Sequence, residues 1–310
     1  MPLLREPLLA AARSPRLRSV AERSRLTRPV VDRFVAGPTE PEALKVTHAL
    51  LDAGLWVTLD FLGEDTTSRE QAEATVSAYV SILSELATHD VADRAEVSVK
   101  LSAIGQSLPG DGQRIALDGA RTICAAAAAA GTTVTVDMED HATTDSTLAI
   151  VTELRQDFEW VGTVLQAYLK RTEGDCRDLA GAGSRVRICK GAYAEPESVA
   201  FTGDAVDESY VRCLNVLMAG DGYPMIATHD PAMIAAAHTA IIEHGRTSGT
   251  FEFQMLFGVR PAEQRAIAAE GHRMRVYVPY GDEWYGYFMR RLAERPANLT
   301  FFLRSLTSKK

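Results

Sequence analysis

Eight short apolar or β-branched runs recur along the chain, and a segment with helical periodicity follows each of them. The runs begin at Trp56, Val97, Thr133, Trp160, Arg185, Pro224, Thr250 and Met274. Short apolar runs bounded by turn residues are typical of buried strands, and their alternation with helical segments indicates repeated β-α units. Eight such units over roughly 250 residues match the size and rhythm of an α/β protein of the (β/α)8 TIM-type barrel class.

A doubly wound open sheet is the main alternative to the barrel. A dinucleotide-binding sheet of that kind would carry a G-x-G-x-x-G turn after its first strand, but the stretch DFLGEDTTSRE contains one glycine. No linker or low-complexity segment divides the chain. We therefore expect a single barrel domain over residues 1–310, with residues 1–54 forming an N-terminal helical arm within it.

The charge balance argues against nucleic acid as a partner. The chain has 33 Lys and Arg residues against 41 Asp and Glu residues, a formal net charge of −8, so it lacks the positive field that nucleic acid or an anionic membrane would select. No apolar run approaches the roughly 20 residues needed to cross a bilayer. The four cysteines show no CxxC pairing, which favours a reducing, cytoplasmic location.

Polar residues follow or end the predicted strands, which is where barrel enzymes place their active sites. These residues are Lys100, Asp137, Gln166, Arg187, Lys190, Thr228, His229, Glu252, Gln254 and Tyr277. Any one of them could be merely solvated or ion-paired, but a purely structural barrel has no need for such a set on one rim. An inward-facing charge requires a partner, and an anionic ligand could provide it.

Several other kinds of site find little support in the sequence. No HExxH motif is present and the seven histidines are scattered, so we expect no metal site. The G-x-S-x-G turn and the P-loop are also absent. Lys100 or Lys190 could serve as a Schiff-base lysine, which keeps a barrel lyase open. A barrel that binds a carboxylate or a flavin without turnover is a third possibility.

The stretch GDEWYGYFMRRLAERPAN near the end of the chain predicts a helix over the barrel mouth. Asp282 is a plausible N-cap and Pro296 ends the helix. Arg290 and Arg291 lie one turn before Glu294, an arrangement that an exposed Arg/Glu ladder could also explain. The aromatic residues just before them add more apolar bulk than a solvated face would keep. We therefore interpret the helix as a carboxylate clamp, since arginine pairs bidentately with carboxylates.

Seven ordered motifs resemble those of the proline dehydrogenase family. They are VKLSAIG, DMEDH, LQAYLKRT, RICKGAY, ATHD, FEFQML and VYVPYGDEWYGYFMRRLAERPAN. The resemblance extends from about Arg33 onward and is to the monofunctional bacterial type; Cys189 in RICKGAY is a small departure from the usual RLVKGAY. It implies an FAD-dependent enzyme that oxidises L-proline to Δ1-pyrroline-5-carboxylate, the first step of proline catabolism.

The resemblance also implies roles for individual positions. Arg290 and Arg291 would grip the proline carboxylate, with Lys100 as a third cationic contact and Glu294 in the same cluster. Tyr277 would pack against the substrate ring. Asp137 would set the charges around the substrate, and Arg187 would lie beside the reactive flavin nitrogen, which makes these two the expected catalytic residues. The positions expected to hold or adjoin FAD are Met138, Gln166, Arg187, Lys190, Gly191, Ala192, Thr228, His229, Glu252 and Gln254.

The family further suggests a membrane quinone as the electron acceptor. Because no segment is expected to span the bilayer, the protein would have to associate peripherally with the surface of the inner membrane to reach that acceptor. The first 33 residues are rich in arginine and are a candidate for that contact, although the sequence favours a packed helix over it.

Overall fold

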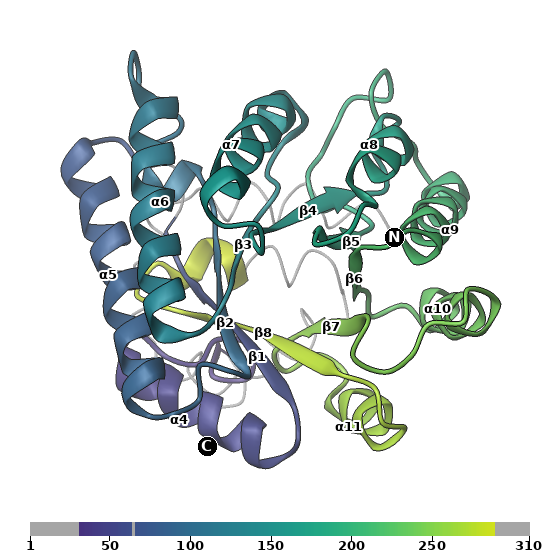
Figure 1. Ribbon diagram of the computed structural model, residues 1–310. Helices are drawn as coiled ribbons and strands as arrows, with labels where there is room; N and C mark the ends of the chain where they lie inside the picture. Colours follow the sequence, from purple (N-terminus) through teal and green to yellow (C-terminus); the bar gives the residue numbers. More distant parts are fainter. Residues whose placement is uncertain (1–30, 64–65, 289–310) are drawn as a thin grey trace, which may run out of the picture.

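The computed structural model describes residues 31–63 and 66–288, whose strands close into a barrel (Figure 1). Within these ranges eight parallel strands follow one another in sequence order, and the last pairs with the first. The strands are β1 (Trp56–Phe61), β2 (Ala95–Val99), β3 (Val134–Val136), β4 (Gly162–Gln166), β5 (Arg185–Cys189), β6 (Tyr223–Ala227), β7 (Glu252–Leu256) and β8 (Met274–Tyr280). The predicted barrel is confirmed, and the closed sheet excludes the doubly wound alternative.

Helices form an outer layer around the strands (Figure 1). They are α4 (Glu40–Asp52), α5 (Arg69–Thr88), α6 (Gly112–Ala130), α7 (Thr144–Asp157), α8 (Thr172–Leu179), α9 (Asp204–Ala219), α10 (Pro231–Glu243) and α11 (Pro261–Ala269), with short 3-10 turns η2 (Ser102–Ile104) and η3 (His141–Thr143). Local sequence fixes their starts. Ser68 accepts a hydrogen bond from the Gln71 amide at the start of α5, and Asp230 does the same for Ala232 at the start of α10.

The strands alternate between two environments, as their two-residue period requires. Val57 and Leu59 point outward into the hydrophobic core shared with the helices, whereas Thr58 and Asp60 of the same strand belong to the barrel interior. All four are buried, with relative exposures of 0 to 1%. The outer face therefore supplies the apolar burial that stabilises the fold, and the inner face is left to polar chemistry.

The strand positions of four candidate residues differ from the expectation. Arg187 and Tyr277 lie within β5 and β8 rather than at their ends, and Gln254 is the middle residue of β7. Glu252 begins β7 and is therefore at the opposite end of the strand from the position expected of it. The predicted run begins at Thr250, two residues before β7 begins at Glu252. Glu252 therefore lies nearer the start of its strand than the predicted run places it.

The C-terminal helix begins within the described part of the chain. Residues 284–288 are helical, and the sheet-to-helix turn includes Gly281 at φ 121°, a conformation that favours glycine. Arg290, Arg291 and Glu294 lie outside the described residues, as does the basic segment at 1–30. No helix in the described ranges is long and apolar enough to cross a membrane.

Candidate active site

A cavity of about 600 Å³ lies on the barrel interior toward the carboxyl ends of the strands. This volume falls within the range of about 300–1,000 Å³ that is usual for small-molecule sites. The candidate residues that line it are Lys100, Asp137, Met138, Gln166, Arg187, Lys190, Gly191, Ala192, Thr228, His229, Gln254 and Tyr277. The structure thus brings together every described candidate except Glu252, which is fully buried and is not part of the lining.

Lys100 is held in the cavity by two carboxylates. Its Nζ lies 2.9 Å from both oxygens of Asp60 and 3.5 Å from Oδ2 of Asp137. Asp60 is 1% exposed and comes from β1, the one strand for which the sequence analysis proposed no site residue. The signal was present in WVTLDFLG, where a single acidic residue stands near the end of an otherwise apolar strand.

Asp137 is the centre of the hydrogen-bond cluster. Its carboxylate accepts hydrogen bonds from Arg187 Nη1 and Tyr277 Oη, both at 2.6 Å, and from Ser98 Oγ at 2.7 Å. Burial opposes the charged form, but Arg187, Lys100 and the two hydroxyl donors outweigh it and lower the pKa of Asp137 below its usual value. Asp137 is therefore an ionised acceptor that fixes the groups around it.

Arg187 has one donor atom that the described residues leave without a partner. Its Nε donates to Gln254 Oε1 at 2.5 Å and its Nη1 to Asp137, whereas the buried Nη2 has no hydrogen-bond partner among the described residues. Burial works against the charge, but Asp137 and other acidic neighbours raise the pKa of Arg187. Arg187 also lines the cavity, and a permanently charged group at a cavity wall suits a ligand with an electron-rich atom.

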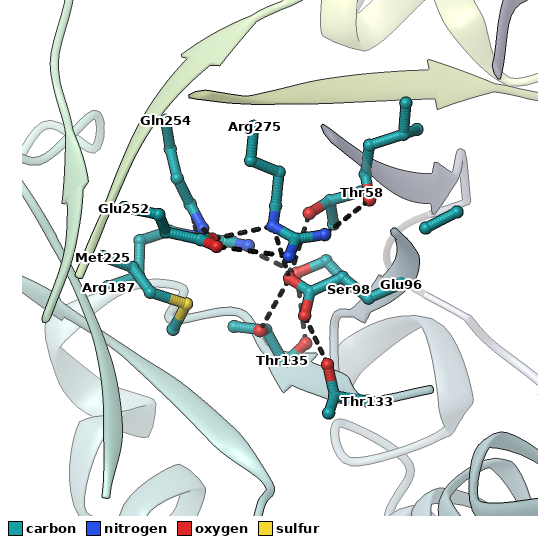
Figure 2. Close-up of polar contacts among 12 residues, drawn as sticks. Thr58, Glu96, Ser98, Thr133, Thr135, Arg187, Met225, Glu252, Gln254 and Arg275 are labelled. Carbon is teal, nitrogen blue, oxygen red and sulfur yellow. Dashed lines mark hydrogen bonds and ion pairs between the residues drawn. The ribbon is translucent and has the colours of Figure 1, made fainter. Parts of the chain in front are cut away.

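A second polar layer lies beneath Arg187 and connects it to Glu252 (Figure 2). Gln254 Nε2 donates to Glu252 Oε1 at 2.6 Å, and Arg275 Nε donates to the same oxygen at 2.7 Å. Glu96 lies 2.7 Å from Arg185 and 3.8 Å from Arg275. Burial opposes its charge, but Arg275 and Arg185 lower the pKa of Glu96 to about 2. Glu252 is thus part of an ion-pair layer that supports Arg187 through Gln254.

The wall formed after β5 is held by ion pairs and by one obligatory glycine. Lys190 Nζ pairs with Asp230 at 2.7 Å and also with Asp207. Partial burial opposes the ammonium form, but the hydrogen bonds to these two carboxylates raise the pKa of Lys190. Gly191 has φ 117°, and a Cβ there would lie 2.2 Å from the Tyr168 ring. Close packing of Tyr168 therefore requires glycine at position 191, whether or not a ligand also approaches this backbone.

Further lining residues are fixed by contacts to the backbone. Gln166 Nε2 donates to the Glu139 carbonyl at 2.7 Å, and Thr228 Oγ1 accepts from the Asp230 amide at 3.1 Å. His229 Nε2 accepts a hydrogen bond from the Leu256 amide at 2.9 Å, which places the proton of a neutral ring on Nδ1. These contacts preorganise the site at the ends of β4 and β6.

Comparison with protein families shows the family to which the chain belongs. The family model described as proline dehydrogenase matches residues 43–304. The chain belongs to the proline dehydrogenase family. It is therefore an enzyme of the oxidoreductase class, and the resemblance of the seven motifs is confirmed.

Two curated members of the family match nearly end to end. The chain is 40% identical over 278 residues to proline dehydrogenase 1 of Bacillus subtilis, covering 89% of this chain and 90% of that protein. It is 37% identical over 307 residues to proline dehydrogenase of Deinococcus radiodurans, covering 98% of each. These lengths agree with the monofunctional type.

Solved structures share the same fold. The crystal structure of proline utilization A from Bdellovibrio bacteriovorus, inactivated by N-propargylglycine, superposes with a TM-score of 0.80 at 25% identity. The match covers 92% of this chain but 34% of that one, so the chain spans about a third of the larger protein. Proline utilization A from Bradyrhizobium japonicum gives a TM-score of 0.71 at 23% identity and supports the fold alone.

Proposed function

We propose that the cavity binds FAD together with L-proline, and that the enzyme oxidises L-proline to Δ1-pyrroline-5-carboxylate by hydride transfer to FAD. The observation that carries this proposal is the convergence of the described candidate residues on one cavity, with Arg187 presenting a buried donor that has no acceptor among the described residues. Membership of the proline dehydrogenase family supports this reaction, and the lining and volume of the cavity support this place for it.

The lining fits a flavin cofactor by the chemistry of its donors. Met138 and Ala192 offer apolar contact area, and Lys190, with its charge held by Asp207 and Asp230, stands where an anionic group could bind. The guanidinium of Arg187 lines the same cavity and would donate a hydrogen bond to an electron-rich ring atom. Bound here, FAD would supply the hydride acceptor that no amino-acid side chain can provide.

The substrate must be held rigidly, because hydride leaves a ring carbon next to the amine. Lys100 and Tyr277 stand together in the lining, with Lys100 Nζ 3.3 Å from the Tyr277 hydroxyl and 5.9 Å from its ring centre. They would contact the carboxylate and the ring of proline, and Arg290 and Arg291 would complete the carboxylate grip.

The charges of the described cluster are balanced, with Lys100 and Arg187 against Asp60 and Asp137. Hydride transfer requires a neutral substrate amine, because a protonated nitrogen has no lone pair to donate. A net positive surrounding would favour that neutral form. In our proposal Arg290 and Arg291 supply this positive excess when the site is complete, with Glu294 moderating it.

The contacts of the two candidate lysines weaken the alternative of a Schiff-base lyase. A lysine that attacks a carbonyl needs a free lone pair and is usually desolvated or placed near another cation. Lys100 and Lys190 are each paired with two carboxylates, which stabilise the ammonium form. The alternative of a barrel that binds a ligand without turnover can be distinguished from an enzyme by an activity assay.

We further propose that the electrons pass from the flavin to a quinone, and that the protein works in the cytoplasm and visits the inner membrane. The support is chemical: the described ranges contain no membrane-crossing helix, so a lipid-soluble acceptor would be reached from the surface. The eight arginines among the first 33 residues could interact with anionic lipids there. Reduction of a quinone analogue in vesicles, compared with a protein truncated before Arg33, tests this step.

Turnover of L-proline with an artificial dye acceptor tests the main proposal. The purified protein should reduce the dye only when L-proline is present, and the product should react with o-aminobenzaldehyde as a pyrroline does. Arg291→Met should raise KM for proline severely while leaving the flavin bound, because the lost contact is to substrate. Flavin loss in that variant would contradict the assigned role, and dye reduction without proline would contradict the function.

A further inference from the structure

A second cluster of chemically competent side chains lies on the outside of the barrel, away from the cavity. His238 belongs to α10, whereas Glu270 and His272 follow α11 and precede β8. None of the three lines the active-site cavity. We propose that His238, Glu270 and His272 form a binding site for a divalent first-row transition metal ion. The proposal rests on the geometry of these three residues and is independent of the proposed function.

The three side chains converge as the ligands of one ion would. One ligand atom from each lies within 4.8 Å of the other two, and among the described residues no other trio of His, Cys, Asp or Glu does so. His238 Nε2 is 3.7 Å from Glu270 Oε2, and the two imidazole ring centres are 5.5 Å apart. Small rotations of half-exposed side chains would complete the approach.

These separations match a tetrahedral site. With metal–nitrogen distances of about 2.1 Å, neighbouring ligand atoms lie about 3.4 Å apart and the centres of two bound imidazoles about 5.2 Å apart. The observed 3.7 Å and 5.5 Å are each within a few tenths of an ångström of those values.

The surroundings hold the rings in place and leave a nitrogen available. The His272 Nδ1 atom is buried and has no hydrogen-bond partner among the described residues. Phe253 packs against both imidazoles, with ring centres 5.3 Å from His238 and 5.6 Å from His272, and Phe251 lies 5.5 Å from His272. A buried nitrogen without a partner is unfavourable, and a metal ion would satisfy it.

The donor set selects the class of ion. Two imidazoles and one carboxylate suit Zn²⁺, Ni²⁺, Co²⁺ or Cu²⁺, whereas Mg²⁺ and Ca²⁺ prefer oxygen ligands. His238 of α10 already contacts Glu270 and His272 of the segment between α11 and β8, and a bound ion would add coordinate bonds between the two segments. The proposed site is therefore structural, and its occupancy would raise thermal stability by ligand linkage.

Calorimetric titration of tag-free, chelator-treated holoenzyme with Ni²⁺ tests the proposal. Ni²⁺ is chosen because thiolates compete less for it than for Zn²⁺. We expect one site per chain, with affinity at least about tenfold lower in His238→Gln and in His272→Gln. At about a hundredfold excess over the wild-type Kd, the wild-type Tm should rise by about 4 °C, and the Tm of either variant should rise by no more than about 2 °C.

His89→Gln is the matched control. His89 Nε2 also lies 3.7 Å from a glutamate, Glu85, and its ring centre is 5.2 Å from that of His48, yet these residues do not form a three-ligand group. Binding should be unchanged in this control. The proposal is overturned if wild-type protein takes up no Ni²⁺ at millimolar concentration, if His238→Gln binds as well as wild type, or if His89→Gln removes the site.

Discussion

Glu252→Gln separates two roles that the same residue could have. The family resemblance places Glu252 near the cofactor, whereas the structure places it at 0% exposure below the cavity, in contact with Arg275 and Gln254. Glutamine keeps the shape of the side chain and removes its charge. One of its amide hydrogens would then face Arg275 or Gln254, and the Gln254 amide that orients Arg187 would have to turn.

The expected cost follows from the contacts that are lost. Breaking one side of a buried ion pair usually destabilises a protein by about 3–5 kcal/mol. Because Arg275 retains Glu96 at 3.8 Å, we expect the lower end, about 3 kcal/mol. For a chain of 310 residues this corresponds to a fall in Tm of about 5 °C. Misorientation of Arg187 should also lower kcat/KM about tenfold, or about 1.4 kcal/mol of transition-state stabilisation.

Thermal unfolding at saturating FAD, flavin titration and steady-state kinetics measure the three effects separately. The Kd for FAD should rise by less than about fivefold, since Glu252 does not line the cavity and would affect the cofactor only through Arg187. Glu73→Gln is the control, because Glu73 makes an exposed pair with Arg69 at 3.2 Å and should change stability by no more than about 0.5 kcal/mol. A tenfold loss of FAD affinity with unchanged Tm would refute the reasoning.

Three further outcomes follow from the site. Asp60→Asn removes the closer carboxylate from Lys100 and leaves the ion pair with Asp137 at 3.5 Å, so kcat/KM should fall at least about tenfold in steady-state assays while the protein retains its flavin. Tyr277→Phe removes the 2.6 Å hydrogen bond to ionised Asp137, worth about 1.5–3 kcal/mol, and should lower kcat/KM about tenfold to a hundredfold; an unchanged value would contradict the arrangement. The folded-state pKa of Glu96, about 2, lies below its value of 4.5 in an unfolded chain, so its stabilisation is complete above about pH 4.5 and is lost as pH falls toward 2. Urea unfolding should therefore show decreasing stability over that window, and stability that rises on acidification would contradict the ion-pair layer.

The barrel could be predicted from the sequence because its signals are local. The run beginning at Trp56 became β1 (Trp56–Phe61), and the run beginning at Met274 became β8 (Met274–Tyr280). Strand length, turn residues and helical periodicity are all short-range properties, and eight repeats leave few ways to close a sheet. The depth of a residue within the barrel is not local, which is why Glu252 and Gln254 could not be assigned to different layers.

The candidate site could be predicted in part for the same reason. Lys100, Asp137 and Arg187 stand at or near strand ends, and the closed barrel brings them into one cavity. Asp60 also stands near the end of its strand and lines the cavity. Its signal in the sequence is weak because it is the only charged residue in an otherwise mostly apolar strand. His238 and His272 belong to different β-α units, so the spacing of residues along the chain gave no indication that they would meet.

The visible spectrum of the purified protein under anaerobic conditions, before and after L-proline, tests the central claim most directly. A proline dehydrogenase that uses FAD should be yellow, with flavin absorption that bleaches on addition of L-proline and returns when an electron acceptor is admitted. Protein that stays colourless after reconstitution with FAD, or flavin absorption that L-proline leaves unchanged, would contradict it.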